Sequence, residues 1–234
     1  MISCTSREPG GATAAGSDPI HLHMTLTVWT VGHSTRPLPD FLAVLAAYRI
    51  ELVADVRRFP GSRSQPQYQQ PALEATLHRA GIGYAWLPNL GGRRRPAPES
   101  SNITWRHPAF RGYADHLAGE EFAAGLFELL ALAWGLRTAV MCAEVLWWRC
   151  HRRMIADVLV SLGGRVIHIM DAKTAQTHRL EAPAHLIRGV LSYLPQDRPQ
   201  EKRLRRRREI PPGLQPPEQQ VIVQHSPLRT QGVE

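Results

Sequence analysis

The feature that most constrains the fold of this chain is a regular alternation of strand-like and helix-like segments. Short runs rich in β-branched and aromatic residues end at Gly, Asp or polar clusters, and most are followed by apolar residues at helical spacing. The expected strands are 26–31, 51–56, 83–87, 137–144 and 165–171, and the expected helices are 38–50, 71–81, 120–135 and 150–164. Strands that alternate with helices imply right-handed crossovers and a mostly parallel sheet. The sequence therefore predicts a three-layer, Rossmann-like α/β fold with helices on both faces of the sheet.

The two ends of the chain differ in composition from this alternating region. Residues 1–23 are rich in Gly, Ser, Thr and Ala without periodicity, which favours disorder and makes Met24 an alternative start of translation to Met1. Residues 191–234 form a basic, Pro/Gln-rich segment that is also predicted to be disordered. We therefore expect a single α/β domain over residues 24–190.

Basic charge is concentrated in the predicted tail. Residues 198–209 hold seven basic and two acidic residues, so they carry +5 of the net charge of +8. Such a run can bind nucleic acid by counterion release, or it can simply keep a solvated tail soluble. A nucleic-acid partner is therefore one of two interpretations of the tail.

The cysteine content and hydropathy predict a cytoplasmic protein. The three cysteines, Cys4, Cys142 and Cys150, do not make a disulfide framework. The N-terminus lacks the apolar region of a secretory signal, and no run approaches the roughly 18 consecutive apolar residues that a membrane span needs. We expect no membrane partner.

Residues suited to anion binding directly follow the predicted strands. In open α/β sheets the ligand crevice lies outside the carboxyl ends of the strands. The planar guanidinium group of arginine suits phosphate, and Gly or Ser permits close backbone approach. The predicted binding residues are Gly32, Ser34, Arg57, Arg58, Arg63, Gly91, Gly92, Arg93, Arg152 and Arg153. They predict a site for a phosphorylated small molecule or a nucleic acid.

Reactive groups are densest in the stretch MCAEVLWWRCHRRMIADVL, residues 141–159. A thiol beside cations in the first turn of a helix is activated as a nucleophile, and carboxylates and histidines can carry protons. The predicted catalytic residues are Glu144, Cys142, Cys150, His151, His33 and Asp55. The pattern specifies no cofactor.

Several of these residues also have simpler interpretations. Asp55 could cap a loop or pair with a neighbouring arginine, His33 could be a core histidine, and Cys142 could be a small core residue at the end of a buried strand. His168 alternates with apolar neighbours inside a predicted strand, so we interpret it as structural.

Metal binding is a further hypothesis for the same cysteines. Cys142, Cys150 and His151 could be three zinc ligands, with His33 or Asp55 completing the site. Two features weigh against it: seven residues separate the cysteines, which matches no common short zinc motif, and adjacent Cys and His rarely bind one ion together.

Five ordered motifs carry a resemblance to a known family. They are VGHSTRPLPDFLAVL, LVADVRRFPGSRSQPQY, GIGYAWLPNLGGRRR, FRGYADHL and MCAEVLWWRCHRRMIADVL. Together they resemble the domain of unknown function family 488 over about residues 27–170. The resemblance implies a compact α/β domain whose motifs group into one site, and it implies no reaction.

Three functions from different classes follow from these observations. The first is an enzyme, a hydrolase or transferase, that uses the Glu, Cys and His residues on a phosphorylated or nucleic-acid substrate. The second is a nucleic-acid-binding module without catalysis, which would use the tail and the arginine-rich edge. The third is a thiol or metal redox sensor, in which Cys142 and Cys150 pair on oxidation, which requires Cα atoms within about 7 Å.

Overall fold

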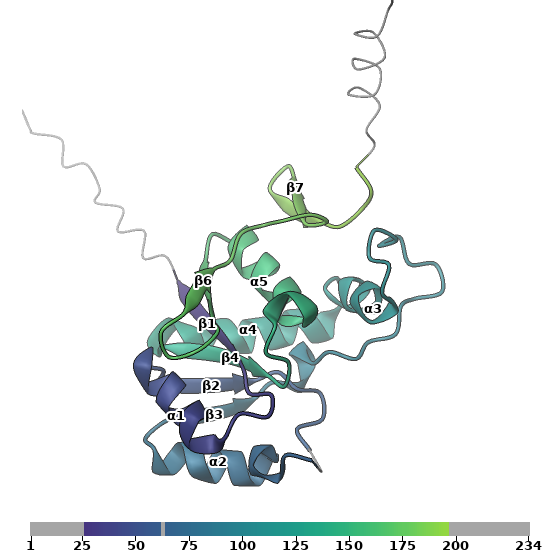
Figure 1. Cartoon of the computed structure of the whole chain (residues 1–234). Coiled ribbons are helices and arrows are strands. Elements are labelled where there is room, and N and C mark those ends of the chain that lie inside the picture. The colour runs from purple at the N-terminus through teal and green to yellow at the C-terminus, as the bar shows by residue number, and fades with distance from the viewer. Residues whose placement is uncertain (1–25, 62–63, 197–234) are drawn as a thin grey trace, which may run out of the picture. The chain divides into compact units, whose positions relative to one another are not determined.

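A computed structural model describes residues 26–61 and 64–196, and a six-stranded sheet forms the centre of this part of the chain (Figure 1). The strand order is β3-β2-β4-β1-β5-β6, and every pairing is parallel except that of β5 with β6. The strands are β1 (Thr27–Gly32), β2 (Leu52–Asp55), β3 (Gly83–Trp86), β4 (Thr138–Cys142), β5 (Arg165–Ile169) and β6 (Ala175–Thr177). The helices are α1 (Leu38–Ala47), α2 (Gln70–Arg79), α3 (Pro108–His116), α4 (Glu120–Gly135) and α5 (Arg152–Ser161), with short 3-10 turns η1 (Pro66–Tyr68), η2 (Pro88–Leu90) and η3 (Trp147–Arg149).

Helices cover both faces of the sheet, as the alternation of segments predicts. Side chains of successive strand residues point to opposite faces, so each central strand contributes to two separate cores. Val31 and Met141 pack with apolar residues of α1 and α2, whereas Val28 and Val140 pack with those of α3, α4 and α5. The predicted α/β, three-layer, mostly parallel architecture is confirmed.

The C-terminal part of the described region holds elements that the sequence pattern did not predict. After β5 the chain returns as the exposed antiparallel strand β6, and it then forms a hairpin of β7 (His185–Ile187) and β8 (Val190–Ser192). The predicted tail begins at residue 191, inside β8. These strands have only three residues each and alternate weakly, which explains why periodicity did not reveal them.

Several predictions concern residues outside the described part of the chain. They are the N-terminal extension with Met24, the basic run at 198–209 and the binding residue Arg63. Among the helices of residues 26–61 and 64–196, none is long and apolar enough to cross a membrane.

Candidate functional site

The site lies where β1 and β4 end side by side at the carboxyl edge of the sheet. Gly32 is in register with Cys142, and the backbone pairing continues past the strands, from the His33 amide to the Cys142 carbonyl at 3.0 Å and from the Ser34 amide to the Ala143 carbonyl at 2.8 Å. A Cβ atom at Gly32 would overlap the carbonyl of Glu144. The absence of a side chain at Gly32 therefore lets the loop after β4 lie directly against the loop after β1.

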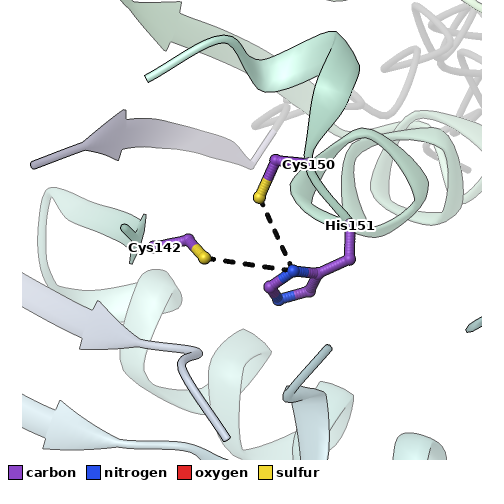
Figure 2. Close-up of side chains that lie close together, drawn as sticks. All are labelled: Cys142, Cys150 and His151. Atoms are coloured by element: carbon purple, nitrogen blue, oxygen red, sulfur yellow. Dashed lines mark hydrogen bonds between the residues drawn. The ribbon is translucent and has the colours of Figure 1, made fainter. Parts of the chain in front are cut away.

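Cys142, Cys150 and His151 form a cluster at this edge (Figure 2). The Nδ1 atom of His151 lies 3.5 Å from Sγ of Cys150 and 4.0 Å from Sγ of Cys142, and the three atoms all lie within 4.8 Å of one another. The other ring nitrogen, Nε2, lies 3.2 Å from the carbonyl oxygen of Val56, to which it can only donate. In the neutral imidazole, that hydrogen bond places the single ring proton on Nε2, so the lone pair of Nδ1 faces both sulfur atoms.

Backbone geometry explains how two adjacent residues point into one cluster. Cys150 is extended, with φ −122° and ψ 151°, whereas His151 is helical, with φ −59° and ψ −18°. The change of conformation between them turns both side chains toward Cys142. Gly92 makes room for the ring, since a Cβ atom there would lie 2.7 Å from Nδ1 of His151.

The two thiols differ in acidity because they interact. The hydrogen bond from Cys142 holds the pKa of the Cys150 thiol well below its usual range. The same hydrogen bond, together with burial, raises the pKa of Cys142. The pair therefore favours a single thiolate shared between two sulfur atoms.

Two adjoining pockets meet at the cluster. The smaller has a volume of about 220 Å³ and includes Arg58 in its lining, and the larger has a volume of about 750 Å³ and includes Arg149. Arg93, Cys142 and His151 line both pockets. Within residues 26–61 and 64–196, Arg58, Arg93 and Arg149 make no ion pair, although the Glu144 carboxylate also lines the larger pocket.

Asp55 and Arg57 form a buried ion pair beside the smaller pocket. Their side chains are joined by a contact of 2.5 Å between Oδ2 and Nη2 and one of 2.9 Å between Oδ1 and Nε. Tyr84 donates a further hydrogen bond of 2.8 Å to Asp55, and Arg57 also donates to the carbonyl of Tyr68. These contacts occupy both groups, so the geometry favours the simpler interpretation of Asp55 over a general base.

His33 lines the smaller pocket but is held in place on all sides. Its Nδ1 donates to the carbonyl of Ser34 at 2.8 Å, its Nε2 lies 3.2 Å from Nη1 of Arg57, and its ring stacks on Tyr68. Burial lowers the pKa of His33 to about 4. The ring is therefore neutral at pH 7, and it orients Arg57.

The two arginines at the start of α5 do not point into the pockets. Arg152 is 1% exposed and donates to Thr30 and to the carbonyls of Glu144 and Val145, which fixes the loop after β4. Arg153 donates instead to two carbonyls of the chain between β6 and β7. Both were predicted to bind substrate, and the geometry favours structural roles for both.

The remaining predicted residues shape or line the site. Glu144 and Ser34 line the larger pocket, and the side chain of Glu144 is exposed. Gly91 lies so close to the backbone of Arg58 that a Cβ atom would be 2.8 Å from the Arg58 Cα. Gly91 thus permits close approach of two backbone segments, whereas Gly92 makes room for a side chain.

Comparison with known proteins identifies the family. The model of the family described as "Domain of unknown function DUF488" matches residues 37–159, a little over half of the 234 residues. The chain belongs to the DUF488 family. No curated protein and no solved structure matches it.

The DUF488 match includes Cys142, Cys150 and His151, and it confirms the predicted resemblance to this family. Several residues of the larger pocket in this DUF488 protein were not among the predicted site residues. They are His107, Phe110, Trp148 and Arg149. His107 directly precedes α3 and Phe110 lies in it, so both are distant in sequence from the cysteines. Arg149 lies in the stretch 141–159, where its charge could have indicated a role in anion binding.

Proposed function

We propose that this protein is an enzyme that binds an anionic, phosphorylated substrate at the carboxyl edge of the sheet and acts on it by hydrolysis or group transfer. The observation that carries the proposal is that three arginines without ion-pair partners, among the described residues, line two pockets that meet at Cys142, Cys150 and His151. Anion-binding groups and reactive groups thus share one space.

The placement of the arginines is costly without a ligand. Like charges that converge on one pocket repel each other, and arginine is the side chain best suited to bidentate binding of phosphate. Arg93 also has φ +57°, in the left-handed region, where a residue other than glycine costs on the order of 1 kcal/mol. Strain and repulsion at one residue are typical of a functional position.

The size of the pockets supports a small substrate over a nucleic-acid duplex. The larger pocket, at about 750 Å³, is in the range of sites for small molecules, which are concave and contain a few polar groups, and the smaller pocket adds about 220 Å³. The aromatic rings of Phe110 and Trp148 in the larger pocket could pack against the organic part of such a substrate while the arginines bind its phosphate.

Titration with inorganic phosphate tests the anion site. We expect the variant Arg93→Gln to bind phosphate on the order of tenfold more weakly than the natural sequence, because it removes a cation from both pockets. Arg95→Gln is the matched control, since Arg95 is exposed and lines neither pocket. Isothermal titration calorimetry at constant ionic strength measures the affinities. Equal affinity in all three proteins would exclude this anion site.

A screen of phosphate esters and anhydrides then tests for catalysis, with released phosphate and substrate mass as readouts. We expect turnover that Arg93→Gln impairs mainly through a higher KM. Turnover that is identical in the natural protein and in Arg93→Gln would contradict the proposed role of the pocket.

A further inference from the structure

We infer that Cys142, Cys150 and His151 bind one zinc-type divalent metal ion, whose fourth coordination position opens into the two pockets. The metal site itself is argued from the geometry of the three side chains. Its role as the reactive centre for a bound anion rests on the proposed function.

The separations of the three ligand atoms match tetrahedral coordination. Zn–S bonds of about 2.3 Å and Zn–N bonds of about 2.0 Å at tetrahedral angles place S and N about 3.5 Å apart and two S atoms about 3.8 Å apart. Nδ1 of His151 lies 3.5 and 4.0 Å from the two sulfur atoms, and no two of the three atoms are more than 4.8 Å apart. Shifts of a few tenths of an ångström to about one ångström would close the three ligands on an ion.

The hydrogen bonding of His151 is that of a metal ligand. A ligating imidazole commonly donates its other ring N–H to a carboxylate or a backbone carbonyl, which fixes both the tautomer and the orientation of the ring. Nε2 of His151 makes this contact with the carbonyl of Val56, and Gly92 leaves the space that the ring occupies. The free lone pair of Nδ1 is therefore directed at the cluster before any metal binds.

The objection from sequence, that adjacent Cys and His rarely bind one ion, does not hold for this backbone. The change from extended to helical conformation between Cys150 and His151 points both side chains to the same place. Figure 2 shows Sγ of Cys150 and Nδ1 of His151 facing each other from the adjacent residues that lead into α5.

The fourth position is open in the described part of the chain. His33 and Asp55, the residues that could have completed the site, are not in the cluster, and both are held by contacts with Arg57. Three protein ligands with an open position are typical of catalytic zinc, whereas structural zinc has four. Both cysteines and His151 line the larger pocket, so water or a substrate oxygen can reach the ion.

Charge balance makes the metal site compatible with anion binding. Two thiolates neutralise a divalent cation, so the arginines of the pockets still give the site a positive field. A metal ion in this position would polarise a phosphoryl oxygen or a bound water, which is chemistry suited to hydrolysis.

Metal content of the full-length protein, purified in reductant, is the first test. We expect about one equivalent of zinc by elemental analysis, and the same mass difference between native and denatured spectra. After removal of the metal, titration with Co²⁺ should produce thiolate charge-transfer and tetrahedral d–d absorption that saturates at one equivalent.

Variants assign the ligands. Cys142→Ser, Cys150→Ser and His151→Gln should each weaken metal binding on the order of 100-fold, whereas Cys4→Ser, the matched thiol control, should leave it unchanged. If a variant does not fold, the natural protein still tests the inference, because zinc should protect two of its three thiols from alkylation. Failure to bind Zn²⁺ or Co²⁺, binding unaffected by the three variants, or alkylation independent of zinc would overturn the inference.

The metal inference and the proposed function can fail separately. Arg93→Gln should bind zinc normally and phosphate weakly. Phosphate binding without any zinc binding would refute the metal site and support the anion site. Zinc binding without phosphate binding would support the metal site and refute the proposed substrate class.

Discussion

At Gly92, the absence of a side chain determines where His151 can lie. A Cβ atom at this position would lie 2.7 Å from Nδ1, whereas the backbone itself is not in the left-handed region, so alanine is excluded by contact and not by conformation. Gly92 thus leaves the space that the ring of His151, a residue distant in sequence, occupies.

We therefore predict that Gly92→Ala disturbs the cluster more than the fold. The variant should lose on the order of tenfold in affinity for Co²⁺, because the ring of His151 must move, and its thermal midpoint should change little. Gly135→Ala is the control, since no atom lies within 4 Å of its Cβ position. Unchanged Co²⁺ spectra and affinity in Gly92→Ala would contradict the contact.

The ion pair between Asp55 and Arg57 differs from a surface pair because both side chains are buried, at 0% and 7% exposure. Removing one partner leaves the other charge desolvated and unpaired. Asp55→Asn should therefore lower the free energy of unfolding by about 3 kcal/mol or more. Glu121→Gln, which removes an exposed ion pair with Arg94, should lower it by less than about 1 kcal/mol. Urea unfolding measures both, and equal effects would count against burial as the cause.

Among the elements, a chain of buried hydrogen bonds runs from the first turn of α5 through β1 and β5 and back to the same helix. Arg152 donates to Thr30, whose hydroxyl lies 2.7 Å from Nδ1 of His168. The second nitrogen of His168 lies 2.9 Å from His178, which in turn contacts Asp157 at 2.8 Å. The chain links β1, β5 and α5, and through Arg152 it holds the loop that carries Glu144. The structural role predicted for His168 fits this arrangement.

Tyr193, directly after β8, completes this chain by donating a hydrogen bond of 2.8 Å to Asp157. We predict that Tyr193→Phe lowers the free energy of unfolding by about 2 kcal/mol, because the acceptor is a buried carboxylate. Tyr48→Phe, whose hydroxyl makes no hydrogen bond within the described residues, should have an effect below about 0.5 kcal/mol. Denaturant unfolding monitored by circular dichroism compares the two. An equally small effect for Tyr193→Phe would show that the C-terminal hairpin contributes little to the domain.

For the whole molecule, burial of neutral histidines makes stability depend on pH. Burial lowers the pKa of His33 to about 4 and that of His168 to about 2. The folded state therefore binds fewer protons than the unfolded state wherever the pH lies between these values and about 6.5. The contribution of these neutral histidines to the free energy of unfolding is fully present above pH 6.5. Each histidine lowers the free energy of unfolding by about 1.4 kcal/mol for every pH unit below that value, until the pKa of the folded state is reached.

We predict that the free energy of unfolding falls steadily from pH 6.5 to pH 5, as measured by urea titration at fixed ionic strength. His168→Asn should reduce the slope, because one of the two titrating groups is then absent. His78→Asn should not, since His78 is exposed on α2. A free energy of unfolding that is constant between pH 7.5 and pH 5 would show that these rings are not held neutral.

The sequence by itself determined the layers, the positions of the main strands and helices, and the edge at which reactive residues collect. Local periodicity specifies these features, because 2.0- and 3.6-residue repeats decide which residues can face a core. It also identified the cysteines, His151 and the arginine-rich loops, since residues after parallel strands must meet at one edge.

Only the tertiary structure decided which of those residues share a site. Arg57, Arg58, Arg93, Arg152 and Arg153 look alike in sequence, but only the first three line the smaller pocket, and Arg57 is paired there with Asp55. Arg152 and Arg153 line neither pocket and instead donate to backbone carbonyls. Cys150 and His151 converge because the backbone changes from extended to helical conformation between them, and the loop after β4 brings them back to Cys142. Many side-chain partners lie in segments that are distant in sequence, such as His151 with Val56 and Arg152 with Thr30, and no local pattern predicts such contacts.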